Sequence, residues 1–438
     1  MFKIGFARRC ITPPVGAPLA GFAARTGVCE GVHDDLFARA LVLEDASAAV
    51  ALVSLDLLAV ASDFVAGARR EIAARVPIDP RAILISSTHT HAGPVTVSTF
   101  FNPDESLDGV YMAQLRDAIA GAVEAAWKAR FPGRVGVGTA MIEGLGVNRR
   151  AADHEPVDRE IGIVKVEDLG GRARAALIHY ACHPTVLGPD NLLASADFPW
   201  MALDRVEREL GEGSFAMYVN GAQGDISVGH SSELSAIGVI TPGRTFERAA
   251  ELGRALGDAV LRAIPAIAAE DAPRLNFSTL TVHLPLKRYP APELTAKSLR
   301  EAQEKVDKLS ANGNTVECHQ AKTQLLYGSI THYYARETAK YQDGILPVEL
   351  QAIRIGDNVF VGVPAEVFVE IGLHLKRAGP PRTFVAGVTN GYIGYLPTRK
   401  AYEAGGYEVV SSKCGPDAED RLVGGVEQLQ RTLGLRHG

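Results

Sequence analysis

The sequence predicts an α/β fold, with mixed β-sheets in the centre, helices flanking them, and a helical-hairpin insertion. Two observations carry this prediction: three pairs of apolar runs read as strand hairpins, and segments with a helical spacing of apolar residues separate them. The length of 438 residues, 47% of them hydrophobic, allows a large buried core. The composition is that of a folded globular protein and excludes a disordered or coiled-coil chain.

The predicted strands share one design, because each hairpin ends at a polar residue. The three hairpins span residues 38–56, 161–184 and 348–366, and a fourth apolar strand spans residues 82–85. The polar residues that follow these strands are Asp56, His183, Glu366 and the pair His89 and His91. Open α/β sheets usually place their chemistry at strand ends, so we expect these side chains to converge on one edge.

Helices are predicted between the strands. Apolar residues recur at helical spacing over residues 64–76, 109–128 and 247–263. Asp63 is the expected N-cap of the first helix. The stretch 287–343 is rich in Lys, Glu and Gln, and it predicts a helical hairpin with a turn at residues 312–314. We expect this insertion to lie beside the sheet, either as a lid or as an exposed decoration.

Charge and cysteine usage bear on partners and compartment. The chain has 45 basic and 51 acidic residues, a net charge of −6, and no long run of Lys or Arg, which argues against nucleic acid as a partner. No segment reaches the length of a transmembrane helix, and the first residues lack the pattern of a secretory signal. The five cysteines are widely spaced, as is typical of reduced thiols. We therefore expect a cytoplasmic protein without a transmembrane segment.

The strongest local signal is the pair His89 and His91. On an extended strand, residues i and i+2 project to the same side, so both imidazoles are expected to face one volume. Such a pair either binds a metal ion or forms structural hydrogen bonds. The turn at Gly93 and Pro94 favours a metal site, because it leaves space in front of the rings. His183, taken alone, is more typical of a buried structural histidine.

Three further features are less specific. Glu366 follows a buried strand and needs a cation or several donors to offset its desolvation, and zinc would serve. The glycine-containing loop that ends at Ser227 lacks the G-x-S-x-G and P-loop patterns, so a serine nucleophile is only weakly indicated. A late aromatic loop carries Tyr392, Tyr395, Tyr402 and Tyr407. Tyrosines in such a loop most often pack with their hydroxyls at the surface.

Together and in this order, the motifs resemble those of the neutral/alkaline non-lysosomal ceramidase family. No single motif suffices, but five in one order would seldom occur by chance, and the resemblance covers nearly the whole chain. The motifs are STHTHAGP at residues 87–94, HPT at 183–185 with SADFPW at 195–200, GDIS at 224–227, VPAE at 363–366, and the spacing of Tyr395, Tyr402, Tyr407 and Glu408. The segment ITPPVGAPLAGF and the pair Asn148 and Arg149 are also similar to that family.

The resemblance implies a zinc-dependent amidohydrolase that cleaves an amide (N-acyl) bond by attack of zinc-bound water. The implied ligands of one Zn²⁺ per chain are His89, His183, Glu366 and Tyr395. The implied catalytic residues are His91 and Tyr407 at the substrate carbonyl, Arg149 nearby, and Ser227 on the loop that lines the site. The implied fold is a single ceramidase-like catalytic domain over residues 1–438 with α/β/β/α-like layers, and we expect no C-terminal immunoglobulin-like domain.

The expected substrate is a small-molecule or lipid-like amide, and there are three alternatives. A zinc-dependent esterase or lactonase acting on a small soluble metabolite would use the same residues. A noncatalytic binding protein of the same fold is disfavoured, because all four implied ligands are present. Hydrolysis through Ser227 would instead predict covalent labelling by a fluorophosphonate and indifference to chelators.

Overall fold

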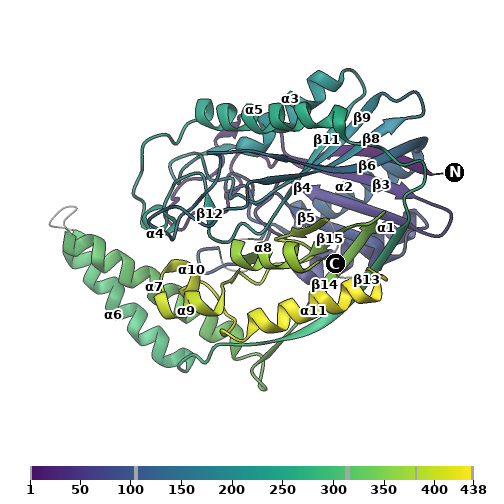
Figure 1. Cartoon of the computed structure of the whole chain (residues 1–438). Helices are drawn as coiled ribbons and strands as arrows, with labels where there is room; N and C mark the ends of the chain where they lie inside the picture. Colours follow the sequence, from purple (N-terminus) through teal and green to yellow (C-terminus); the bar gives the residue numbers. More distant parts are fainter. Residues whose placement is uncertain (1, 103–106, 311–315, 380–381, 436–438) are drawn as a thin grey trace.

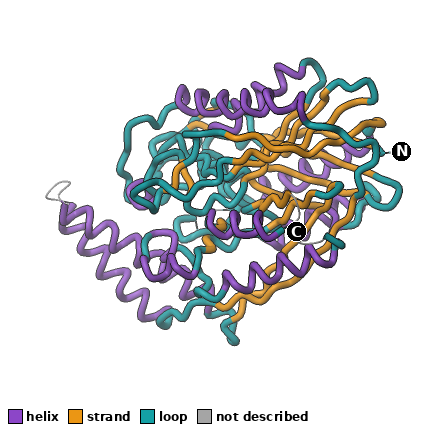
Figure 2. Tube along the Cα trace, viewed as in Figure 1, coloured by secondary structure: helices purple, strands orange, loops and turns teal. Residues whose placement is uncertain are grey.

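Two β-sheets form the centre of the molecule (Figures 1 and 2). The computed structural model describes residues 2–102, 107–310, 316–379 and 382–435. The larger sheet has eight strands in the order β11-β9-β8-β6-β1-β3-β4-β5. These strands are β1 (Lys3–Cys10), β3 (Phe37–Glu44), β4 (Ala49–Leu55), β5 (Ile83–Ser87), β6 (Phe131–Met141), β8 (Glu160–Asp168), β9 (Ala173–Tyr180) and β11 (Phe215–Asn220).

Two of the predicted hairpins are adjacent strands of this sheet. β3 pairs antiparallel with β4, and β8 pairs antiparallel with β9. At each end of the sheet the last pair is parallel: β4 with β5, and β9 with β11. The two ends approach each other, because the hydroxyl of Ser54 in β4 donates a hydrogen bond to the carbonyl of Tyr218 in β11. The carboxyl ends of strands from both ends of the sheet are thus brought together.

The smaller sheet has four strands and contains the third predicted hairpin. Its strands, in spatial order, are β13 (Leu275–Pro285), β14 (Ile345–Ile355), β15 (Asn358–Gly362) and β17 (Arg382–Ala386). β14 and β15 are antiparallel, whereas β15 and β17 are parallel. Ile353 and Phe360 of this sheet pack in the same buried cluster as Val53 and Met217 of the larger sheet. The two sheets therefore share one core.

Three pairs of short strands connect the loops between the main elements. Each pair joins segments that are far apart in the sequence, so the loops are fixed to one another. The pairs are β2 (Gly31–Val32) with β10 (Leu193–Ala194), β7 (Val147–Asn148) with β12 (Ile226–Ser227), and β16 (Glu366–Val367) with β18 (Tyr395–Leu396).

Helices flank the sheets, as predicted. In Figure 1, α3 (Phe198–Leu210) and α5 (Phe246–Ala263) lie together above the larger sheet, and α11 (Ala418–Thr432) lies below the smaller one. Asp108 caps α2 by accepting hydrogen bonds from two backbone amides of its first turn. The other helices of the body are α1 (Ser62–Arg75), α2 (Gly109–Lys128), α4 (Ser232–Ala236), α8 (Val369–Ala378), α9 (Arg399–Ala404) and α10 (Tyr407–Val410), with 3₁₀ turns at Pro80–Ala82 and Ile264–Ala266.

The start of α1 differs from the prediction. The helix begins at Ser62, so Ala61 occupies the N-cap position and Asp63 lies in the first turn. The carboxylate of Asp63 accepts a hydrogen bond from the amide of Phe64 at 2.7 Å. An acidic side chain in the first turn stabilises the helix through its dipole, which gives the same sequence signal as an N-cap.

The helices α6 (Pro292–Ser310) and α7 (Val316–Thr338) lie side by side and extend away from the body (Figure 1). They occupy the chain between β13 and β14, within the stretch where the sequence predicts a helical hairpin. The expected turn at residues 312–314 lies outside the described residues. Among the helices of the described ranges, none combines the length and the apolar character needed to cross a bilayer.

Candidate metal centre

Three strands deliver polar side chains to one place. The chain leaves β5 towards His89, leaves β9 towards His183, and leaves β15 towards Glu366. The expected convergence holds for these three residues, which are in contact. Asp56 does not join them: its carboxylate accepts a hydrogen bond from the amide of Phe37, and burial raises its pKa to about 6. The strand ends thus supply two imidazoles and one carboxylate.

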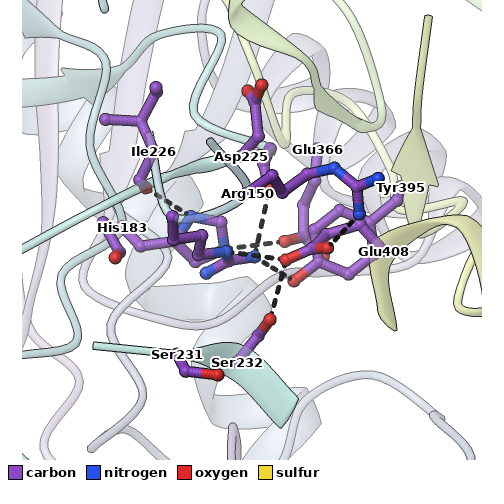
Figure 3. Close-up of polar contacts among 12 residues, drawn as sticks. Arg150, His183, Asp225, Ile226, Ser231, Ser232, Glu366, Tyr395 and Glu408 are labelled. Carbon is purple, nitrogen blue, oxygen red and sulfur yellow. Dashed lines mark hydrogen bonds and ion pairs between the residues drawn. The ribbon is translucent and has the colours of Figure 1, made fainter. Parts of the chain in front are cut away.

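The two imidazoles and the carboxylate are fully buried. The Oε2 atom of Glu366 lies 2.8 Å from Nε2 of His183 (Figure 3) and 3.2 Å from Nε2 of His89. None of the three side chains is more than 2% exposed. Each imidazole is also held on its other side, since Nδ1 lies 2.8 Å from a backbone carbonyl, that of Leu58 for His89 and that of Gln223 for His183.

These contacts fix which ring nitrogen carries hydrogen. A carbonyl oxygen only accepts hydrogen bonds, so Nδ1 must donate, and Nε2 of the neutral ring presents a lone pair to Glu366. Burial, with the nearby charge of Arg149, lowers the pKa of His183 to about 4. A carboxylate therefore faces an imidazole lone pair at 2.8 Å, an arrangement that a cation stabilises.

His91 adds a third imidazole. One ring nitrogen from each of His89, His91 and His183 lies within 4.8 Å of the other two. Both ring nitrogens of His91 are buried and have no hydrogen-bond partner among the residues that the structure describes. Burial and the two neighbouring imidazoles hold the pKa of His91 well below its usual value, so this ring is neutral. A buried imidazole without a partner indicates a place for a bound ligand.

The backbone at His89 differs from the prediction. β5 ends at Ser87, and His89 has a φ of 71°, in the left-handed region. The expectation that His89 and His91 lie on one face of an extended strand is therefore wrong, although their ring centroids are 5.1 Å apart. The amide of His89 donates to the carbonyl of Leu57 at 2.9 Å, which helps to hold this conformation. Such a conformation costs on the order of 1–3 kcal/mol and is concentrated at functional sites.

Asn220, at the end of β11, joins the two histidine-bearing segments. Its side-chain amide donates to the carbonyl of Thr88 at 3.0 Å and to that of Cys182 at 3.1 Å. These residues immediately precede His89 and His183. The sequence pattern does not reveal this positioning role, because it depends on how the two ends of the larger sheet meet.

Two tyrosines of the late aromatic loop reach the site. The hydroxyl of Tyr392 donates to Oε1 of Glu366 at 2.6 Å, on the carboxylate oxygen that the histidines leave free. Tyr395 is the register partner of Glu366 between β16 and β18, and its hydroxyl accepts a hydrogen bond from Arg149 at 3.0 Å. Motif spacing singles out Tyr395 but not Tyr392, for which the aromatic composition of the loop is the available signal.

Arg149 belongs to a buried network of charges around Glu408. The carboxylate of Glu408 accepts hydrogen bonds from Arg150 and Ser232 at 2.7 Å each (Figure 3). It also accepts one from Arg149 at 2.8 Å. The side chains of Arg149 and Glu408 are 5% and 3% exposed. Burial alone would lower the pKa of Arg149, but the Tyr395 phenol and the Glu408 carboxylate raise it above its ordinary value. Arg149 is therefore a fixed positive charge beside Tyr395.

The remaining two predicted site residues lie in different surroundings. Tyr407 lines the same cavity as His91, and its ring centroid lies 6.0 Å from that of Tyr395. The hydroxyl of Ser227, in β12, donates to the carbonyl of His230 at 3.0 Å. Ser227 is not among the described residues that line the cavity. The structure thus brings the other predicted site residues together and leaves Ser227 apart from them.

A cavity of about 430 Å³ opens onto this group of side chains, a volume typical of small-molecule sites. His89, His91, Glu366 and Tyr395 contribute to its lining. The rest of the lining combines apolar and charged side chains from the segment after β5, from α1, α2 and α7, and from the chain after α10. These include Asp63, Val97, Phe100, Phe101, Leu107, Met112, Arg116, Tyr333, Tyr334, Glu337 and Lys413.

The chain is similar in sequence to neutral ceramidases along nearly its full length. A family model described as neutral/alkaline non-lysosomal ceramidase, N-terminal, matches residues 2–232. Neutral ceramidase from Drosophila melanogaster is 24% identical over 537 residues, which cover 99% of this chain and 74% of that protein. Neutral ceramidase from Pseudomonas aeruginosa is 23% identical over 483 residues, which cover 95% of this chain and 69% of that protein.

Solved structures of ceramidases have the same fold. The crystal structure of neutral ceramidase from Pseudomonas aeruginosa aligns with all of this chain and 75% of its own, with a TM-score of 0.76 at 20% identity. A structure described as ceramidase complexed with C2 gives a TM-score of 0.76 at 19% identity, again over the whole of this chain and 76% of its own. Since the family model matches more than half of the sequence, the chain belongs to the neutral/alkaline non-lysosomal ceramidase family of amide hydrolases.

Proposed function

We propose that this chain is a zinc-dependent hydrolase that cleaves an amide (N-acyl) bond by ceramidase-like chemistry. One observation carries the metal: the ionised carboxylate of Glu366 faces the Nε2 lone pair of His183 at 2.8 Å inside a fully buried site. A carboxylate oxygen and the lone pair of a neutral imidazole repel each other at this distance, and a cation held by both would offset the repulsion. Imidazole and carboxylate are the ligand types that zinc takes in hydrolases. Membership of the ceramidase family supports the amide bond as the target.

The donor set fits one zinc ion per chain. The residues that would hold it are His89, His183, Glu366 and Tyr395. Each of these side chains has a second contact that orients it, as ligands in metal sites usually do. These contacts are the carbonyls of Leu58 and Gln223 behind the two imidazoles, the hydroxyl of Tyr392 on Glu366, and the guanidinium of Arg149 on Tyr395.

The groups around the ligands are suited to amide hydrolysis. Zinc, when bound, supplies a Lewis acid for the amide carbonyl and lowers the pKa of water towards about 7. His91 is neutral and has an unused ring N–H, which would donate to the carbonyl oxygen as negative charge develops there. The hydroxyl of Tyr407 would donate to the same oxygen from the wall of the cavity. Arg149 adds a fixed positive charge that favours this build-up of negative charge.

The test is to remove and restore the metal. The purified chain is dialysed against a chelator and assayed with octanoyl p-nitroanilide and a short-chain ceramide, before and after one equivalent of zinc or of magnesium is added. We expect zinc alone to restore amide hydrolysis, and we expect a fluorophosphonate to leave it unchanged. Hydrolysis that survives removal of the metal would contradict the proposal.

The same assay separates amide from ester chemistry. Octanoyl p-nitrophenyl ester and a δ-lactone are included, because the same residues would stabilise the charge that develops on any of these carbonyls. Cleavage of the ester or lactone with no cleavage of either amide would identify the chain as an esterase or lactonase. Zinc-dependent cleavage of the amides is the expected result.

A further inference from the structure

We infer that the cavity beside the metal centre selects N-acyl amides that carry a carboxylate, and that Arg116 and Lys413 bind this carboxylate. The inference rests on the proposed amide hydrolysis and adds the class of substrate. Both cations line the cavity, one from α2 and the other from the segment that follows α10. Since the same cavity is lined by His89, His91 and Glu366, a molecule bound to the two cations would lie close to the reacting groups.

The two cations lack close counter-charges. The Nε atom of Arg116 is buried without a hydrogen-bond partner, and its guanidinium lies over the ring of Phe64, 5.5 Å from the centroid. The Nζ atom of Lys413 lies 5.9 Å from the ring centroid of Tyr334. Neither side chain forms an ion pair with a carboxylate in the ranges that the structure describes. Burial lowers the pKa of Lys413, and the charge of Glu337 only partly offsets this effect.

The carboxylates of the cavity, in contrast, are already occupied. Glu337 pairs with Lys340 at 2.7 Å, and Asp63 accepts a hydrogen bond from the amide of Phe64 at 2.7 Å. Glu366 is held between its two histidines. Of the cavity's carboxylates, Glu337 is thus paired with a cation, whereas Arg116 and Lys413 form no ion pair within the described ranges. Cations that are partly withdrawn from water are stabilised by a counter-charge, and here an anionic group of the ligand would supply it.

The apolar part of the lining accounts for the other half of the substrate. Phe100, Phe101, Leu107 and Met112 line the same cavity and offer contact to an acyl chain. Arg116 and Lys413 are only partly exposed, so a neutral lipid with two long chains that filled the cavity would shield both cations from water without pairing them, at a cost in binding. An N-acyl amino acid satisfies both kinds of lining. Its hydrolysis breaks the C–N bond, transfers the water oxygen to the acyl carbon and protonates the amine, which gives a fatty acid and an amino acid.

The experiment compares substrates that differ only in charge. The zinc-loaded chain is assayed with N-octanoylglycine, with the neutral N-octanoylglycinamide, and with suberic acid monoanilide, which carries the carboxylate on the acyl side. The variants are Lys413→Met and Arg116→Met, with Lys128→Met as a matched control on the exposed part of α2. Calorimetric binding of N-octanoylglycine provides a readout that does not depend on turnover. The third substrate shows on which side of the amide the carboxylate is recognised.

We expect each cavity variant to lower kcat/KM for a carboxylate substrate by roughly tenfold to a hundredfold, the usual range for a charge-assisted contact. The cavity variants should turn over N-octanoylglycinamide as the unmodified chain does. Lys128→Met should turn over every substrate as the unmodified chain does. Equal losses for charged and neutral amides, or a preference of the unmodified chain for the neutral amide, would overturn the inference. If no amide is hydrolysed, the proposed function fails. The anion site is then tested by calorimetry alone, and binding of N-octanoylglycine that is unaffected in both cavity variants overturns the inference.

Discussion

Replacing His183 by alanine tests the metal centre most directly. The substitution removes a fully buried nitrogen that lies 2.8 Å from Glu366, and among the described residues it leaves one imidazole, that of His89, in contact with that carboxylate. Four-ligand zinc sites bind with apparent free energies of about 10–16 kcal/mol, or about 3 kcal/mol per ligand. Loss of one ligand therefore weakens zinc binding by roughly a hundredfold or more. We expect His183→Ala to lose its zinc to a competing indicator that the unmodified chain resists.

His179→Ala is the matched control for this experiment. His179 lies in β9, four residues before His183, is also buried, and contacts a backbone carbonyl, that of Val385 at 2.9 Å. Each substitution leaves a buried carbonyl without its donor and should destabilise the fold by about 1–3 kcal/mol. At the same zinc concentration, zinc should raise the melting temperature of His179→Ala more than that of His183→Ala, because the gain in stability grows with the affinity for the ligand. Unchanged zinc affinity in His183→Ala, or an equal loss in both variants, would refute the ligand assignment.

Three further substitutions separate metal binding from turnover. Tyr392→Phe removes the 2.6 Å hydrogen bond to Glu366. We expect the zinc affinity, measured by indicator competition, to fall by roughly tenfold to a hundredfold. An unchanged affinity would show that this hydrogen bond does not orient Glu366. Tyr407→Phe should lower kcat while the zinc content of the purified chain stays the same, and an equal loss of both would place this hydroxyl among the metal ligands. Ser227→Ala should keep its turnover and lose about 1 kcal/mol of unfolding free energy, because the Ser227 hydroxyl donates a hydrogen bond to the carbonyl of His230. A folded but inactive variant would show that Ser227 has a chemical role.

Local patterns predict the strands and their ends well. The hairpin that ends at His183 and the one that ends at Glu366 were both recognisable, because apolar runs around a polar turn report local strand pairing. These hairpins end at polar residues because His183 and Glu366 meet in one buried site. The convergence was predictable as a general tendency of α/β sheets, but the sequence contains no measure of which strand ends meet.

The features that escaped prediction depend on tertiary contacts. Asn220 acts through carbonyls on two other segments, and Tyr392 reaches Glu366 only because the late loop folds back along β16. The left-handed backbone of His89 is likewise held by its surroundings, since a φ of 71° is uncommon for any residue other than glycine. Local sequence determines elements, whereas the positions of single side chains within a site follow from how distant elements pack.

The α6–α7 hairpin lines part of the cavity, whereas the residues of the proposed metal centre lie on other elements. The ligands proposed for the metal come from segments anchored in the sheets, while Tyr333, Tyr334 and Glu337 of α7 supply one wall of the cavity. Exchange of this hairpin among relatives would therefore alter which molecules are accepted and leave the hydrolytic machinery intact. Substrate range in such a scaffold is free to diversify faster than the reaction itself.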